Sequence, residues 1–309
     1  MPAVTMYAAL RGYSEALGHP RPVTAISLLA LVVLIPLNMI FMHGLGPIPA
    51  LGSAGCGFAT SILQWLMLIT LAGYIYKASA YRNTSIFSRF DKINLTWVKR
   101  ILKLGLPIGL AVFFEVSIFS TGALVLSPLG EVFIAAHQVA ISVTSVLFMI
   151  PLSLAIALTI RVGTYYGEKN WASMYQVQKI GLSTAVFFAL LTMSFIALGR
   201  EQIVSVYTQD IDVVPVAMYL LWFAMGYQLM DALQVSAAGC LRGMQDTQAP
   251  MWITLMAYWV IAFPIGLYLA RYTHWGVAGV WLGLIIGLSI ACVLLLSRLY
   301  LNTKRLSQT

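Results

Sequence analysis

The chain has 309 residues, of which 60% are hydrophobic and 9% are charged, and its mean hydropathy is +0.87. A soluble domain carries about 25% charged residues, so this composition excludes an ordinary soluble protein and predicts an all-α polytopic membrane protein. The formal net charge of +8 does not indicate nucleic-acid binding, because the basic residues gather in short loops between apolar spans.

A transmembrane helix needs about 20 mainly apolar residues, and eight segments of the chain meet this requirement. They are expected at residues 23–42, 53–77, 101–127, 131–160, 174–198, 213–240, 249–270 and 276–300. Residues 1–10 are apolar but too short to span a bilayer, and they end at Arg11. We interpret them as a stub, the tail of a longer helix.

The distribution of Lys and Arg supports this number of spans and predicts an orientation. If the segment 11–22 faces the cytoplasm, 16 of the 18 Lys and Arg residues fall on the cytoplasmic side, and only Arg200 and Arg271 fall outside it. Because short cytoplasmic loops are enriched in basic residues, the C-terminus is expected in the cytoplasm. The basic segment 78–100 is the longest polar connection, and its last residues are expected to form an interfacial helix.

Two acidic residues, Glu115 and Asp231, lie deep inside apolar spans. A charged side chain at the bilayer centre costs about 2.5–3.5 kcal/mol on insertion scales, so an intramembrane acid indicates a functional site by default. Tyr227 lies four residues before Asp231 and Gln234 lies three residues after it, so these side chains share one helix face. A cation or proton site is the favoured interpretation. The alternatives are a structural, hydrogen-bonded acid and a packing tyrosine.

Other residues have structural interpretations. His137 is expected to be a histidine with satisfied hydrogen bonds near the extracellular end. Arg242 and Asp246 flank a cytoplasmic turn, where local ion pairing or helix capping is expected. Small-residue ridges are expected to pack helices closely. They comprise Gly279, Gly283 and Gly287 in one span and Gly105 and Gly109 in another.

An internal repeat relates the start of the chain to its end. Leu10-Arg11-Gly12 recurs as Leu241-Arg242-Gly243, Pro36-Leu37 as Pro264-Ile265, and Gly52-Ser53-Ala54-Gly55 as Gly276-Val277-Ala278-Gly279, at offsets of 231, 228 and 224 residues. The stub and the next two helices therefore repeat the last three helices in the same direction. Three helices precede the second copy and none precedes the first, so about three helices and part of a fourth are expected to be missing before Met1.

Several runs of residues resemble a known family. The run GCLRGMQDTQAP after a helix that carries Asp231, the FFEVS around Glu115, and AAHQVAISVTSVLFMIPLSLAIALTIRVG resemble the multidrug and toxic compound extrusion (MATE) family, in its NorM-like bacterial branch. The first-half segments RGYSEALGHPRPV and IPLNMIF match it as well. The resemblance implies a 6+6 helix antiporter that exports cationic drugs or dyes by alternating access, driven by Na⁺ or H⁺.

The resemblance also implies residue roles and a domain organisation. The family's cation site, which could hold Na⁺, falls on Glu115, Tyr227 and Asp231, and Gln138 aligns near its drug-binding region. From its position on the same helix face as Asp231, Gln234 is a candidate to line the cavity and equally a helix-contact amide. The expected domains are the remainder of an N-lobe, a basic cytoplasmic inter-lobe linker and a six-helix C-lobe. These domains cover residues 1–77, 78–100 and 101–309. The family's acid on the first helix of the N-lobe has no counterpart in this chain.

The sequence also suggests three alternatives to drug antiport. A lipid or polysaccharide flippase of the wider superfamily would need mid-span Lys or Arg for anionic cargo, and none is present. An enzyme is not expected, because the chain contains no HExxH or GxSxG motif. A non-functional truncated fragment is the third. We expect a multi-pass protein of the bacterial inner membrane with small cationic substrates, lipid contact, no cofactor, and neither nucleic acid nor an obligatory protein partner.

Overall fold

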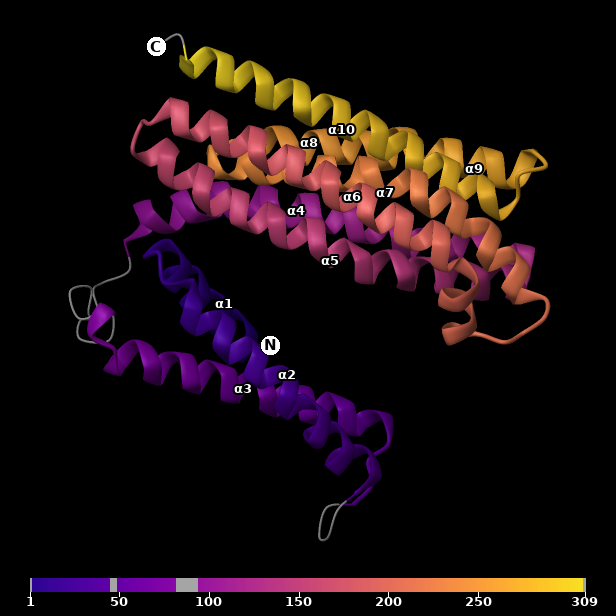
Figure 1. Cartoon of the computed structure of the whole chain (residues 1–309), viewed down its shortest axis with the longest axis horizontal. Coiled ribbons are helices and arrows are strands. Elements are labelled where there is room, and N and C mark those ends of the chain that lie inside the picture. Colours follow the sequence, from indigo (N-terminus) through magenta and orange to yellow (C-terminus); the bar gives the residue numbers. More distant parts are fainter. Residues whose placement is uncertain (1, 45–48, 82–93, 308–309) are drawn as a thin grey trace. The chain divides into compact units, whose positions relative to one another are not determined.

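A computed structural model describes residues 2–44, 49–81 and 94–307, and all the regular structure in these ranges is helical. The chain divides into two compact units, residues 1–93 and 94–309 (Figure 1). Residues 82–93, which belong to the predicted linker, lie outside the described ranges.

Unit 1 holds three helices and a short 3₁₀ turn. These elements are α1 (Pro2–Ala16), α2 (Pro20–His43), α3 (Ser53–Lys77) and η1 (Ser79–Tyr81). The expected end of the first helix at Arg11 is wrong. α1 continues for another turn, in which Arg11 forms an ion pair with Glu15 at 2.7 Å. Pro20 then opens α2, because proline lacks the backbone N–H that a first helical residue would leave unpaired.

Unit 2 contains the remaining elements. They are α4 (Leu95–Leu126), η2 (Ser127–Leu129), α5 (Glu131–Gly167), α6 (Trp171–Tyr207), α7 (Val213–Gly243), α8 (Gln248–Leu255), the π-helical segment η3 (Met256–Ala262), α9 (Phe263–Tyr272) and α10 (Val277–Ser307). The side chain of Asn94 caps α4 by accepting a hydrogen bond from the Thr96 amide at 3.0 Å. The residues expected to form an interfacial helix are therefore the first turns of α4 itself.

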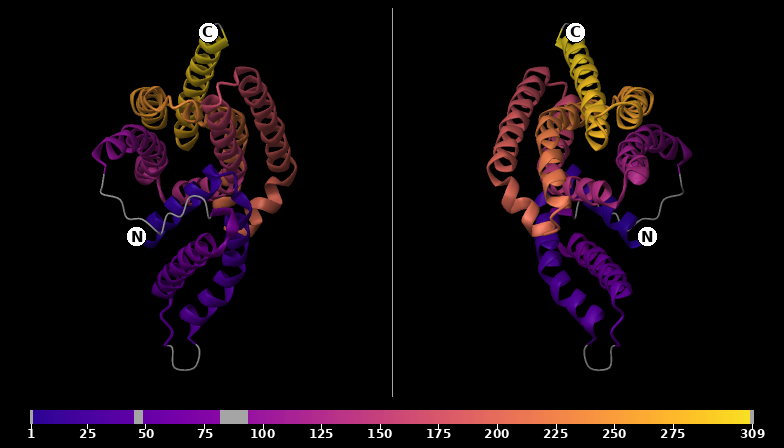
Figure 2. Two further views of the ribbon diagram at one scale, coloured as in Figure 1. Left: turned by 90° about the vertical axis from the view of Figure 1, so that its left-hand side faces the viewer. Right: turned by 90° about the vertical axis from the view of Figure 1, so that its right-hand side faces the viewer.

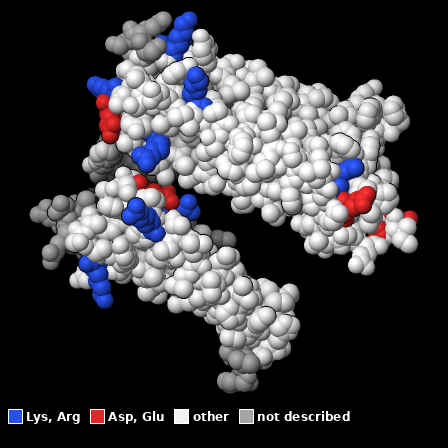
Figure 3. Space-filling view, in the orientation of Figure 1, with Lys and Arg blue, Asp and Glu red and all other residues white. Residues whose placement is uncertain are grey.

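In the described part of the chain, eight helices are long and apolar enough to cross a membrane, which confirms the expected number. In unit 2, Lys and Arg gather toward the end that holds the α5–α6 and α7–α8 connections. On the visible face the long side between the two ends carries almost no charge (Figure 3). Such a charge-free belt is what a bilayer requires of the surface that it surrounds. The protein is a multi-pass membrane protein.

The centre of unit 2 is the close pairing of α5 and α7. α6 and the α8–η3–α9 helix lie on opposite sides of this pair (Figure 2). A Cβ atom at Gly239 would lie 2.5 Å from the Ala155 carbonyl oxygen, so only glycine permits this approach. The Thr159 hydroxyl then donates a hydrogen bond to the Gly239 carbonyl oxygen at 2.9 Å. Small residues and an interhelical hydrogen bond thus hold α7 in the middle of the unit.

The predicted glycine ridge on α10 is confirmed. Cβ atoms at Gly279 and Gly283 would lie 2.6 Å from the Leu269 carbonyl carbon and 2.5 Å from the Gly266 Cα, respectively. The same expectation is wrong for Gly105 and Gly109, where a Cβ would meet no described atom within 4 Å. The ridge lets η3 and α9 approach α10 backbone to backbone.

Candidate cation-binding site

The polar face of α7 is buried inside unit 2. Tyr227, Asp231 and Gln234 are 5%, 1% and 2% exposed, although they lie on a membrane-spanning helix. Their spacing of four and three residues places them on one face, as the sequence predicts. A polar face that is buried in protein rather than in lipid can serve as a binding site.

Neither carboxyl oxygen of Asp231 makes a hydrogen bond of normal geometry with a described residue, although the Tyr227 hydroxyl approaches the carboxyl group closely enough to interact with it. Asp231 lies within electrostatic range of Glu115, Tyr227 and Tyr258, and none of these three carries a positive charge. An isolated carboxylate is very costly in a dry interior. Protonation of Asp231 or a bound cation would remove this cost.

Glu115 reaches the same region from α4. Its side chain is half-buried, and it interacts electrostatically with Asp231. The structure therefore brings together the two acids that the sequence singles out, although 115 residues separate them in the chain. Two carboxylates from different helices would repel each other when both are ionised, and a cation between them removes that repulsion.

Arg242 is the basic residue near this pair, and it does not behave as expected. Asp246 accepts a hydrogen bond from Arg298 of α10 at 2.8 Å and another from Asn302 at 2.7 Å, so the expected local pair of Arg242 with Asp246 is wrong. Arg242 instead lies within electrostatic range of Glu115, and its Nε has no hydrogen-bond partner in the described ranges. It adds one positive charge within electrostatic range of Glu115.

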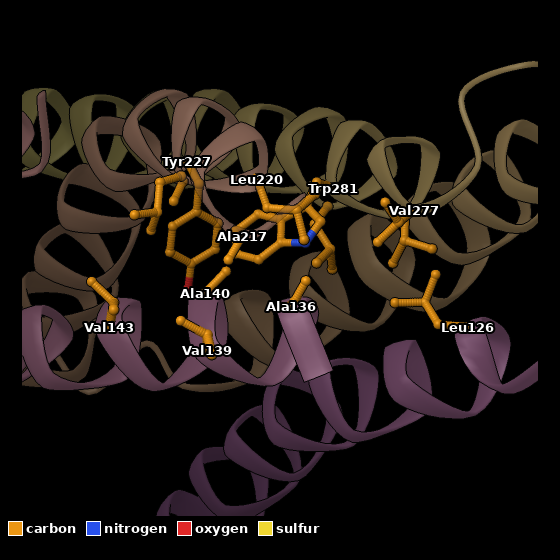
Figure 4. Packing of buried hydrophobic residues seen from close by; sticks show 14 of the residues in the cluster. Leu126, Ala136, Val139, Ala140, Val143, Ala217, Leu220, Tyr227, Val277 and Trp281 are labelled. Atoms are coloured by element: carbon orange, nitrogen blue, oxygen red, sulfur yellow. The ribbon is translucent and has the colours of Figure 1, made fainter. Parts of the chain in front are cut away.

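Tyr227 is held mainly by aromatic packing. Its ring lies edge-on to Phe119 and to Trp281, at centroid distances of 5.9 and 6.3 Å. Figure 4 shows the Tyr227 ring pointing from α7 toward Val139 and Ala140 of α5, with Trp281 beside it. The hydroxyl interacts electrostatically with Asp231, four residues away, so the ring orients a polar group close to the acid.

Two neighbouring aromatic residues of η3, which the sequence interpretation missed, complete the site. The Tyr258 hydroxyl donates a hydrogen bond to Gln234 Oε1 at 2.8 Å, and Trp259 Nε1 donates to the Phe114 carbonyl oxygen at 3.2 Å. Gln234 is therefore a buried helix-contact amide near the acid. The dipeptide Tyr258-Trp259 offers two polar groups inside an apolar span, and this was the signal available in the sequence.

Two other predicted residues have no described contact with the acids. The Gln138 side chain is exposed on unit 2, and no described contact joins it to Glu115 or Asp231. His137 is buried, and its Nδ1 accepts a hydrogen bond from Trp281 Nε1 at 3.2 Å. The expectation of a satisfied histidine is confirmed.

The site lacks the ligands of a transition metal. Within the described ranges, no group of three or more His, Cys, Asp or Glu side chains could hold a metal ion. Two carboxyl groups, a phenol and an amide oxygen are hard oxygen donors, which suit Na⁺ or a proton better than a soft metal. The fold and this buried acidic pair are typical of a membrane transporter.

Sequence comparisons identify the family. The MatE family model matches residues 107–268. The probable multidrug resistance protein NorM of Acinetobacter baylyi is 76% identical over 308 residues, which cover 100% of this chain and 69% of that protein. The multidrug resistance protein NorM of Vibrio cholerae is 41% identical over 306 residues, which cover 97% of this chain and 67% of that protein. The chain therefore belongs to the MatE (MATE) family, whose members are transporters rather than enzymes, and it is similar to the NorM proteins of that family.

Solved structures give the same fold. The eukaryotic MATE transporter AtDTX14 matches with a TM-score of 0.89 at 21% identity, over 99% of this chain and 68% of that one. An outward-facing multidrug resistance MATE transporter matches with a TM-score of 0.79 at 22% identity, over 91% of this chain and 63% of that one. This chain spans about two thirds of the length of its NorM relatives.

Proposed function

We propose that this chain exports small cationic drugs and dyes across the bacterial inner membrane by antiport against Na⁺ or H⁺, with Glu115 and Asp231 as the coupling carboxylates. Asp231 carries the proposal: it is a buried acid on a spanning helix, and neither of its oxygens forms an ion pair within the described ranges. The names of its NorM relatives support drug export as the activity.

The charges of the site support a stoichiometry of one ion. When both carboxyl groups have released their protons, the Arg242 guanidinium near Glu115 leaves a net charge of −1, which one Na⁺ or one proton neutralises. The Tyr227 hydroxyl and the free lone pair of Gln234 Oε1 are then neutral oxygen ligands for the ion. A bound cationic drug also neutralises that charge, so it weakens the electrostatic attraction that holds the ion and favours its release. Inward movement of one charge releases about 2.3 kcal/mol per 100 mV.

The test is efflux of a fluorescent monovalent cation, ethidium, from cells that express the chain. Asp231→Asn and Glu115→Gln remove one charge each at nearly constant shape, and both are expected to reduce efflux to the level of empty-vector cells. The matched control is Glu131→Gln, an exposed acid in the first turn of α5, which should keep parental efflux. Parental efflux in either site variant would overturn the carboxylate mechanism. Absence of efflux from the unsubstituted chain would overturn drug export by this chain.

The distribution of charge supports a cytoplasmic C-terminus. In unit 2, ten Lys and Arg residues lie toward the end that holds the C-terminus, and only Arg200 and Arg271 lie toward the other end. A green fluorescent protein fused after Thr309 should therefore fluoresce, and alkaline phosphatase fused there should be inactive. A fusion after Asp210, in the α6–α7 connection, should behave in the opposite way. Fluorescence of the second fusion would contradict the orientation.

A further inference from the structure

The π-helical segment η3 interrupts an otherwise regular spanning helix. It covers Met256–Ala262, between α8 and α9. A π turn holds more residues than an α turn, so it rotates the side chains within it relative to the flanking helix. Such segments are rare and occur frequently at functional sites. Here Tyr258 and Trp259, next to each other in η3, contact two different helices.

The two contacts end beside the two acids. Tyr258 is fully buried and donates its hydrogen bond to Gln234, which is one turn from Asp231 on α7. Trp259 donates to the carbonyl oxygen of Phe114, the residue immediately before Glu115 on α4. η3 therefore connects the helix turn of one carboxylate to the helix turn of the other.

The side of η3 that faces α10 is fixed by backbone contact. A Cβ at Gly287 would lie 2.5 Å from the Ala262 Cβ and 2.9 Å from the Ala257 carbonyl oxygen. A Cβ at Gly283 would lie 2.8 Å from the Ala262 carbonyl oxygen. Because there is so little free space, η3 cannot move toward α10. The two hydrogen-bond donors of η3 are therefore held in a fixed position relative to α10.

We propose that Tyr258 and Trp259 are positioning residues that set the separation of Glu115 and Asp231, and that η3 is the element through which both carboxylates respond together. This inference rests on the function proposed above, since it assigns a role relative to the same ion. Neither residue needs to touch the ion. A change in the turn geometry of η3 alters both hydrogen bonds at once, and so alters the space between the acids.

The test uses substitutions that remove one donor and keep the ring. Trp259→Phe removes Nε1, and Tyr258→Phe removes the hydroxyl. The chain offers matched controls on the same spanning helix, Trp252→Phe and Tyr268→Phe, because these two aromatic residues are 55% and 60% exposed. The readout is the rate at which dicyclohexylcarbodiimide labels Glu115 and Asp231 in the purified chain, measured by mass spectrometry with and without Na⁺ or choline.

Each donor variant is expected to change the labelling rate, or the Na⁺ concentration for half-protection, by about threefold to tenfold, the effect of one lost hydrogen bond. The two control variants should match the parent. A merely structural role would lower the thermal midpoint without changing the labelling rate of the acids. Labelling rates for Trp259→Phe and Tyr258→Phe equal to those of their controls would overturn the proposal.

Deletion of Val260 tests the π turn itself. Val260 lies within η3 and is exposed, so its removal shortens the turn without taking a contact from the acids. The deletion is expected to change the labelling of both Glu115 and Asp231, whereas each single donor variant acts mainly on the acid nearer to its contact. An unchanged labelling rate at both acids would contradict a role for the π geometry.

The outcomes separate this inference from the proposed function. If Asp231→Asn efflux equals the parental efflux, the proposed function fails, whatever the labelling rates show. If efflux depends on Asp231 but the donor variants behave like Trp252→Phe and Tyr268→Phe, only the inference about η3 fails.

Discussion

The two copies of the internal repeat differ in how closely their last two helices approach. In unit 1 a Cβ at Gly55 of α3 would clash with the Phe41 carbonyl oxygen of α2, and in unit 2 the corresponding Gly279 of α10 meets Leu269 of α9. Phe41 and Leu269 are related by the same offset as the prolines Pro36 and Pro264. The first glycine contact is therefore common to both copies.

The two copies differ at the positions one and two helical turns after this glycine. The positions of Gly283 and Gly287 on α10 correspond to Ala59 and Leu63 on α3. Counted back from the aligned prolines, η3 corresponds to residues 28–34, which belong to the uninterrupted helix α2. A continuous glycine ridge thus accompanies the π segment in one copy, and larger side chains accompany a regular helix in the other. The comparison teaches that small residues on one helix can permit a π-helical irregularity in its neighbour.

Trp281 has the largest expected effect in this comparison. It is 1% exposed, packs against Tyr227 and donates to His137, whereas its counterpart Gly57 would meet no described atom within 4 Å with an added Cβ. Trp281→Ala should lower the free energy of unfolding by about 3–5 kcal/mol, because it leaves a large cavity. Thermal unfolding in detergent measures this, with Gly57→Ala as the neutral control. Equal midpoints for the two variants would contradict the packing.

Gly287→Leu introduces the residue that stands at the corresponding position of unit 1. Its Cβ alone would overlap the Ala262 side chain and the Ala257 carbonyl, so overpacking should destabilise unit 2 by about 1–3 kcal/mol or more. Gly73→Leu in α3 is the control, since no described atom lies within 4 Å of a Cβ there. The yield of folded protein in detergent and its thermal midpoint are the measurements. An unchanged midpoint for Gly287→Leu would show that the ridge does not hold η3.

The repeated Leu-Arg-Gly motifs allow a matched pair of smaller changes. A Cβ at Gly243 would lie 2.8 Å from the Thr159 carbonyl oxygen and 3.0 Å from the Gly163 amide nitrogen, whereas a Cβ at Gly12 would meet no described atom within 4 Å. Gly243→Ala should destabilise by about 1–3 kcal/mol. Gly12→Ala should be neutral or stabilise by up to about 1 kcal/mol, since alanine is the better helix former. If both variants have the same thermal midpoint, the close α5–α7 crossing is incorrect.

Ion pairs provide the smallest contrast. Arg298 and Asp246 connect α10 to the α7–α8 turn at 2.8 Å, whereas Arg11 and Glu15 pair within α1 at 2.7 Å. Both pairs are partly exposed, so Asp246→Asn should cost only about 0.5–1 kcal/mol and Glu15→Gln about 0.3–0.5 kcal/mol. Thermal midpoints at low and high salt measure both losses. A larger loss for Glu15→Gln would reverse the order expected from the second acceptor contact of Asp246 with Asn302.

The sequence alone determined most of the architecture. Eight apolar spans, their basic connections and the repeat follow from local hydrophobicity, which the bilayer forces into helices because each backbone group must be paired within its own segment. The two intramembrane acids were also identifiable, since a charge in an apolar span is conspicuous. The stop at Arg11 was predicted wrongly because one charge within a turn can be satisfied by an (i, i+4) partner, Glu15.

Only the tertiary structure decided which side chains meet. Glu115 and Asp231 lie within electrostatic range of each other because α4 and α7 belong to one packed unit. No local pattern in the sequence predicts that these two residues lie close together. Asp246 pairs with Arg298 rather than with Arg242, because Arg298 of α10 lies beside the α7–α8 turn. The π segment that directs Tyr258 and Trp259 to two helices depends on glycines more than 20 residues further along the chain. Hydrophobicity is a property of each segment, whereas a site depends on the close approach of several segments.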